Sequence, residues 1–236
     1  MKCRIIYATI MFVSIVGSSC AYSGHKGIYG YKVFGALGVS YTDVKIEKFT
    51  YTTENTLDNK YFTCADIGKC SSSVASPSFV FGMGFFSRNH QNFELDLSID
   101  SVKRKFEYGD PIITFDISSL TVSVTPKLLI FSSDKKFRSY IGLSLDVKTM
   151  FISVDSLNAE IHNIPHKYLT ETVLFSSLII GSEYFLNKDR DQSIDFSFKI
   201  GFPSNVNADS KYDTGITAIK LDHNETQLNI GMNYYY

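Results

Sequence analysis

Apolar and polar residues alternate with period two in eight stretches of the chain, each at least nine residues long. Side chains of an extended strand point alternately to opposite faces, so the pattern predicts strands with one apolar and one polar face. In order, the stretches are Gly30–Thr42, Phe79–Ser87, Phe93–Ser101, Phe115–Phe131, Phe137–Thr149, Thr172–Leu186, Ile194–Phe202 and Leu228–Tyr236. A tilted strand of this length can cross a bilayer.

The links between the predicted strands alternate between short and long. The short ones are polar turns at Arg88–Asn92, Ser132–Lys136 and Asn187–Gln192. The long ones, predicted as loops, cover Asp43–Ser78, Val102–Thr114, Met150–Glu171 and Pro203–Glu225. Short turns on one rim and long loops on the other are typical of a bacterial outer-membrane barrel with both termini in the periplasm. The predicted fold is therefore all-β, an eight-stranded antiparallel up-and-down transmembrane β-barrel.

The apolar face of these strands carries almost no charge through its centre, as expected where a mid-bilayer Lys or Arg costs about 2 to 4 kcal/mol. Aromatic residues gather near the strand ends, where membrane barrels have aromatic girdles: Tyr31, Tyr41, Phe79, Phe85, Phe93, Phe202, Tyr234 and Tyr236. Outer-membrane lipids are therefore the expected partners of this face. A soluble secreted barrel binding an apolar ligand is the alternative, and it would turn the apolar face inward.

The polar face carries five bases and six acids: Lys32, Lys127, Arg138, Lys148 and Lys199, with Glu94, Asp96, Asp100, Asp146, Glu183 and Asp195. Side chains fill the interior of an eight-stranded barrel, and an unpaired charge there is costly, so near balance favours a salt-bridged interior. Seven of these residues lie near the periplasmic strand ends: Lys32, Glu94, Asp96, Lys127, Arg138, Glu183 and Asp195. We predict one charged network there, with Arg138 paired to Glu183 and Lys127 to Glu94 or Asp96, which prevents conduction.

The amino terminus has the pattern of an export signal. Basic residues at Lys2 and Arg4 precede an apolar run, Ile5–Val16, which is shorter than a transmembrane helix. Ser19-Cys20-Ala21 is a small-x-small cleavage site, so we expect residues 1–21 to be a signal peptide and 22–236 an outer-membrane barrel domain, exported through the periplasm. A lipoprotein signal acylated at Cys20 is the alternative. No later apolar run is long enough for a transmembrane helix.

Two cysteines would remain after cleavage. Cys64 and Cys70 are separated by five residues in a polar stretch of the first long link. An even pair in an exported chain indicates a local disulfide, and the stretch offers no further metal ligands at suitable spacing. We therefore expect a Cys64–Cys70 disulfide that the barrel itself does not need.

Candidate catalytic chemistry is sparse. The five histidines, His25, His90, His162, His166 and His223, lie outside the predicted strands, so no rigid element holds them against a nucleophile. The sequence predicts no enzyme, no catalytic residue, no cofactor and no metal site. A metal held by His162, His166 and His223 is the alternative if their loops converge. A nucleic-acid partner is not expected.

With its aromatic last residue and eight-strand plan, the chain resembles the small outer-membrane barrels of the OmpA and OmpX type over its mature length. More narrowly, Phe81–Ser87 with Phe93–Ser98 resembles the second hairpin of the rickettsial major surface antigen family. Ser139–Ser144 and Leu228–Tyr236 are similar to that family as well. The resemblance implies a surface-exposed, immunodominant barrel whose loops meet the host, and some members are porin-like.

The leading hypothesis is a monomeric surface antigen, a barrel whose long extracellular loops bind a host surface molecule or an antibody, because loops on a rigid scaffold usually carry specificity. A small porin is the first alternative. The charged interior opposes it unless the charges line a gap or the protein oligomerises. Conductance separates these two, and membrane fractionation would identify the soluble barrel.

Overall fold

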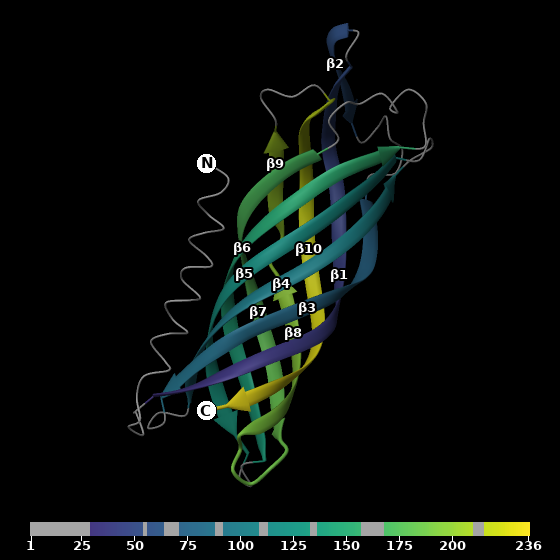
Figure 1. Cartoon of the computed structure of the whole chain (residues 1–236). Helices are drawn as coiled ribbons and strands as arrows, with labels where there is room; N and C mark the ends of the chain where they lie inside the picture. The colour runs from purple at the N-terminus through teal and green to yellow at the C-terminus, as the bar shows by residue number, and fades with distance from the viewer. Residues whose placement is uncertain are drawn as a thin grey trace.

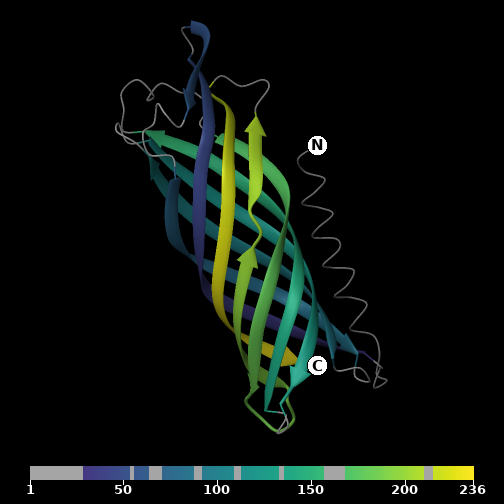
Figure 2. The ribbon, with the colours of Figure 1, turned by 180° about the vertical axis from the view of Figure 1, so that it is seen from behind.

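The computed structural model describes residues 29–53, 56–63, 71–87, 92–108, 113–132, 136–156, 168–209 and 215–236, which form ten β-strands (Figures 1 and 2). In chain order they are β1 (Tyr29–Thr53), β2 (Thr56–Thr63), β3 (Ser71–Ser87), β4 (Phe93–Tyr108), β5 (Ile113–Phe131), β6 (Phe137–Ser156), β7 (Tyr168–Phe185), β8 (Gln192–Gly201), β9 (Ser204–Asp209) and β10 (Gly215–Tyr235). No helix in this part of the chain is long and apolar enough to span a membrane. The predictions for the signal peptide, Cys20, Cys64 and Cys70 fall outside the described residues.

The strands form one closed antiparallel ring. They pair in the order β1-β3-β4-β5-β6-β7-β8-β10, and β10 pairs back to β1 from Lys32↔Tyr235 to Thr52↔Gly215. β8 and β9 both pair with β10, before and after an interruption at residues 202–203, and so form one segment of the wall. β2 folds back on β1 as a hairpin that projects from the barrel in Figure 1. The predicted eight-stranded antiparallel barrel is confirmed.

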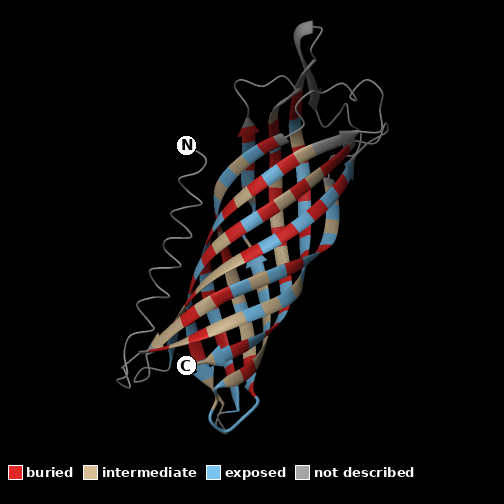
Figure 3. Ribbon diagram, viewed as in Figure 1, coloured by how far each residue is buried: buried red, intermediate tan, exposed pale blue. Residues whose placement is uncertain are grey.

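We call the end of the barrel that carries the short turns its lower end, which lies at the bottom of Figure 1. In the lower part of the wall, buried and exposed residues alternate along each strand (Figure 3). Outward apolar side chains are strongly exposed, with Ile130 at 68% and Leu174 at 71%, whereas inward Lys32 and Glu94 are 0% exposed. An apolar outside around a polar inside is the polarity of a transmembrane barrel. A soluble barrel would have the reverse.

Aromatic pairs mark the lower edge of this apolar belt. Tyr31 and Tyr236 stack with ring centroids 5.1 Å apart, and Phe137 lies 4.9 Å from Tyr184. These rings lie at the strand ends, where an amphipathic ring can sit at the level of the lipid head groups.

Above the belt the two faces of the wall exchange polarity. On β1, Val44 and Ile46 are buried inside, whereas Asp43 and Lys45 are exposed outside. The inward apolar residues form one cluster: Val44, Ile46, Phe49, Phe106, Phe115, Ile117, Met150, Ile152, Leu169, Phe175, Val206, Ala208, Ile219 and Leu221. We call this set the upper core. Here the wall has water rather than lipid outside, so burial of apolar groups inside becomes favourable.

The upper core crosses the inside of the barrel. The ring of Phe49 on β1 meets the ring of Phe115 on β5 edge to face, with centroids 5.5 Å apart. Phe49, Phe106 and Phe115 are at most 1% exposed, and burial of each such side chain stabilises by about 1.5 to 3 kcal/mol. The upper part of the barrel is therefore filled.

The structure corrects the prediction that the long links are loops. β4 continues to Tyr108 and β5 begins at Ile113, so most of the predicted loop Val102–Thr114 is strand. The predicted loops Asp43–Ser78, Met150–Glu171 and Pro203–Glu225 likewise contain parts of β1, β3, β6, β7 and β10, as well as all of β2 and β9. The prediction was wrong because it ended each strand where its outward face became polar.

Candidate functional site

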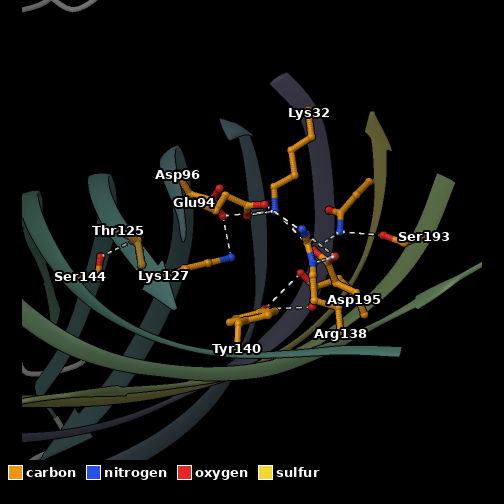
Figure 4. A network of polar contacts seen from close by, with 12 residues as sticks. Lys32, Glu94, Asp96, Thr125, Lys127, Arg138, Tyr140, Ser144, Ser193 and Asp195 are labelled. Carbon is orange, nitrogen blue, oxygen red and sulfur yellow. Dashed lines mark hydrogen bonds and ion pairs between the residues drawn. The ribbon is translucent and has the colours of Figure 1, made fainter. Parts of the chain in front are cut away.

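Six inward residues near the lower end form an ion-pair network, which we call the lower charge cluster (Figure 4). Its members are Lys32, Glu94, Asp96, Lys127, Arg138 and Glu183. All six are at most 4% exposed. Three bases and three acids leave the cluster with no net formal charge.

Lys32 and Arg138 hold the lower charge cluster together. Lys32 Nζ lies 2.5 Å from Glu94 Oε1, 3.5 Å from Asp96 Oδ2 and 3.4 Å from Glu183 Oε1. Arg138 donates from Nε to Glu183 Oε2 at 2.8 Å and from Nη2 to Glu94 Oε2 at 3.1 Å. These contacts cross the lumen, because β8 and β10 lie between β7 and β1 in the ring.

Lys127 reaches the cluster through Asp96, with its Nζ 2.5 Å from Asp96 Oδ2. On the strand between Lys32 and Asp96 lies Gly84, which pairs with both. A Cβ at Gly84 would lie 2.6 Å from Lys32 Cε and would also collide with the Asp96 carboxylate. A side chain at position 84 would therefore displace Lys32 and Asp96 from the arrangement seen here.

Asp195, the seventh residue of the predicted network, is placed apart from these ion pairs. Its Oδ1 accepts a hydrogen bond from the Tyr140 hydroxyl at 2.9 Å, and Asp195 forms no ion pair among the residues that the structure describes. Tyr140 can lie there because its cross-strand neighbour, Gly181, has no side chain; a Cβ at that position would collide with the ring. Sequence reasoning could not foresee this, because it assigned Asp195 by charge and by position on the polar face, which do not show the reach of Tyr140.

A second group, the upper charge cluster, lies higher in the lumen beneath the upper core. Glu225 there forms ion pairs with both Arg104 and Lys148. Glu225 Oε1 also accepts hydrogen bonds from Ser40 Oγ at 2.6 Å and from Gln227 Nε2 at 2.9 Å. Arg104 also donates to Ser119 Oγ at 3.0 Å. One carboxylate thus pairs with two buried cations.

The sequence analysis missed the upper charge cluster because Arg104 and Glu225 fall in predicted loops. The alternation of side chains could have placed both residues. Along β4, Arg104 falls on the same inward face as Glu94, Asp96 and Asp100. Along β10, Glu225 falls on the same inward face as Asn229.

His223 also lies on a strand, β10, contrary to the prediction that all five histidines lie outside strands. It is 2% exposed, its ring centroid is 5.4 Å from that of Phe175, and its Nε2 lies 3.7 Å from Glu225 Oε2. The other four histidines are outside the described residues. No group of three or more candidate metal ligands occurs in the described part of the chain.

Two small cavities lie between the two clusters and beside the upper one. A cavity of about 50 Å³ is lined by Asp96, Lys127 and Tyr140 among others, and one of about 20 Å³ lies beside Lys148 and Glu225. A buried water needs roughly 10 to 15 Å³ of such volume, so these cavities have room for one to a few waters. Neither has the size of an aqueous channel.

Comparisons with known proteins agree with this geometry at the level of fold. No family model matches the chain, and no curated protein sequence matches it. The outer-membrane protein OprG from Pseudomonas aeruginosa has a TM-score of 0.52 at 12% identity over 86% of this chain and 95% of its own. The chain therefore has the fold of a small outer-membrane β-barrel.

Two further structures align over most of their length at lower TM-scores. Neisserial surface protein A has a TM-score of 0.49 at 10% identity, over 88% of this chain and 97% of its own. Ail, the attachment invasion locus protein of Yersinia pestis, solved with the heparin analogue sucrose octasulfate, has a TM-score of 0.43 at 14% identity, over 88% and 99%.

Proposed function

We propose that this protein is a surface-exposed barrel of the bacterial outer membrane, a non-conducting scaffold that presents its upper end to a host surface molecule or antibody. The main observation in support of this proposal is that side chains fill the lumen: the lower charge cluster at the lower end and the upper core above the lipid belt. A lumen filled in this way suits a structural and interaction protein better than a pore. We propose that the lower end faces the periplasm, because it carries the short turns.

The finer assignments belong to this proposal. We propose export with removal of residues 1–21, a monomeric barrel, a Cys64–Cys70 disulfide and no enzymatic activity. Membership of the rickettsial major surface antigen family is proposed from three short segments, which are the Phe81–Ser98 hairpin, Ser139–Ser144 and Leu228–Tyr236.

Conductance tests the scaffold proposal against the small porin. The purified full-length protein should show no large, stable conductance in planar bilayers, because side chains from opposite strands meet across the lumen at two levels. A known porin reconstituted in parallel controls for insertion. Large, stable single-channel steps from the wild-type protein would replace the scaffold proposal with the porin.

Surface labelling tests the orientation. In a background with Cys64 and Cys70 changed to Ser, a single cysteine at Asn207, exposed on β9, should react with an impermeant thiol reagent on intact cells. A single cysteine at Asn187, exposed in the β7–β8 turn, should react only after the outer membrane is opened. Labelling at Asn187 but not at Asn207 on intact cells would reverse the topology.

A further inference from the structure

The lower end of the barrel holds a cavity of about 450 Å³, which opens beneath the lower charge cluster. Phe131, Phe185, Tyr235, Arg138 and Arg190 are among its lining residues. We call this cavity the vestibule. Small-molecule sites in proteins typically measure about 300 to 1,000 Å³ and combine apolar walls with a few polar groups, so the vestibule has the dimensions of a ligand site.

Arg190 is held over an aromatic pair. The Phe131 and Phe185 rings stack at 6.5 Å with an interplanar angle of 8°, and the Arg190 guanidinium carbon lies 5.8 Å and 5.9 Å from their centroids. Arg190 has a φ of 57°, the left-handed region that non-glycine residues seldom adopt. Arg190 thus combines an unfavourable backbone conformation with a guanidinium placed over the two rings.

The two arginines of the vestibule differ in their charge balance. Arg138 lies 5.7 Å and 5.6 Å from the same two ring centroids, but Glu94 and Glu183 neutralise it. Arg190 forms no ion pair with any acid in the part of the chain that the structure describes. Its N–H donors therefore remain available to a ligand.

We propose that the vestibule binds a carboxylate carried on an apolar or aromatic group. A guanidinium presents a planar fork of N–H donors that matches the two oxygens of a carboxylate, and the rings supply contact for the apolar part. Asp189 and Asp191 also line the vestibule. Their charges oppose a phosphate dianion more strongly than a monoanion, which favours a carboxylate.

Binding to the full-length protein in detergent micelles tests this site. The probes are N-acetylphenylalanine and a pentapeptide ending in Phe, each with its carboxyl-terminal amide as the matched neutral compound, titrated by calorimetry. We expect the acids to bind at least tenfold more tightly than the amides. Arg190→Gln should weaken acid binding at least tenfold. Lys188→Gln, which removes a vestibule cation that is not placed on the rings, should change it by less than about twofold.

Each outcome decides for or against the site. Binding of both acids indicates small organic acids as ligands, and binding of the peptide alone indicates a polypeptide terminus; both support the proposal. Equal binding of acid and amide overturns it, as does an equal loss in Lys188→Gln and Arg190→Gln. Failure of both acids to bind wild-type protein at about 10 mM overturns it as well, because a site with a dissociation constant of about 1 mM would be mostly occupied at that concentration.

Discussion

Replacing Arg138 with Ala is expected to destabilise the barrel by about 3 to 5 kcal/mol, the usual cost of removing one partner from a buried ion pair. The change leaves the lower charge cluster with two bases and three acids inside a closed wall. Glu183 loses its 2.8 Å bond from Arg138 Nε, and Glu94 loses its 3.1 Å contact with Nη2. Lys32 then remains as the one cluster base near both of these acids.

A second change distinguishes charge imbalance from lost packing. Arg138→Ala combined with Glu183→Gln should recover part of the lost stability, because the cluster regains equal numbers of bases and acids. Urea unfolding in lipid vesicles, followed by heat-modifiable migration, measures each free energy. If the double variant is less stable than Arg138→Ala alone, packing rather than charge dominates this site.

An exposed ion pair provides the matched control. On the outer face above the belt, Lys220 pairs with Glu47 and holds the pKa of that carboxyl below its ordinary value. Both side chains are accessible to water, and an exposed pair of this kind typically contributes less than about 1 kcal/mol. Lys220→Ala should therefore leave unfolding almost unchanged. An equal loss in Lys220→Ala and Arg138→Ala would contradict the special role of the buried cluster.

The fold class followed from alternation and loop lengths because membrane barrels obey a simple rule in the lipid belt. There, strands such as Phe93–Ser101 present Leu95 and Leu97 outward and Glu94 and Asp96 inward, as predicted. Lipid on one side and a narrow lumen on the other fix which face is apolar. The period therefore sufficed to place each of these residues on its face.

The extent of the strands could not be predicted by the same rule, because the rule changes where the lipid ends. Along β4, Val102, Arg104 and Phe106 point inward while Lys103 and Lys105 point outward. Period two continues without interruption, but its polarity is that of a soluble sheet. A search for alternation of either polarity would have extended the strand, whereas a search for a lipid-facing stripe ended it.

Charge balance on the inward face predicted which residues compete for partners, but it could not assign all of them. Six of the seven predicted residues lie together in the lower charge cluster, whereas Asp195 is satisfied by Tyr140. The partner of each acid depends on the stagger between strands and on space left by Gly84 and Gly181. Neither quantity is visible in the pattern of one strand.

Two adjacent residues on β1 test the exchange of polarity above the belt. Ile46→Asp places a carboxylate in the upper core, where Ile46 is 2% exposed, and burial of an unpaired charge is among the most destabilising single changes. We expect a loss of more than about 4 kcal/mol for the upper part of the barrel. Lys45→Asp, one residue away and exposed, should stay within about 0.5 kcal/mol of wild type.

The effect of Ile46→Asp should be confined to the region above the lipid. The lipid belt and the lower charge cluster do not depend on Ile46, so heat-modifiable migration of the barrel should persist. Limited proteolysis on intact cells should cut the Ile46→Asp variant within the upper parts of β1 and β10 and leave Lys45→Asp and wild-type protein resistant. Equal resistance of the two aspartate variants would show that Ile46 faces water and that the wall keeps one polarity along its whole length.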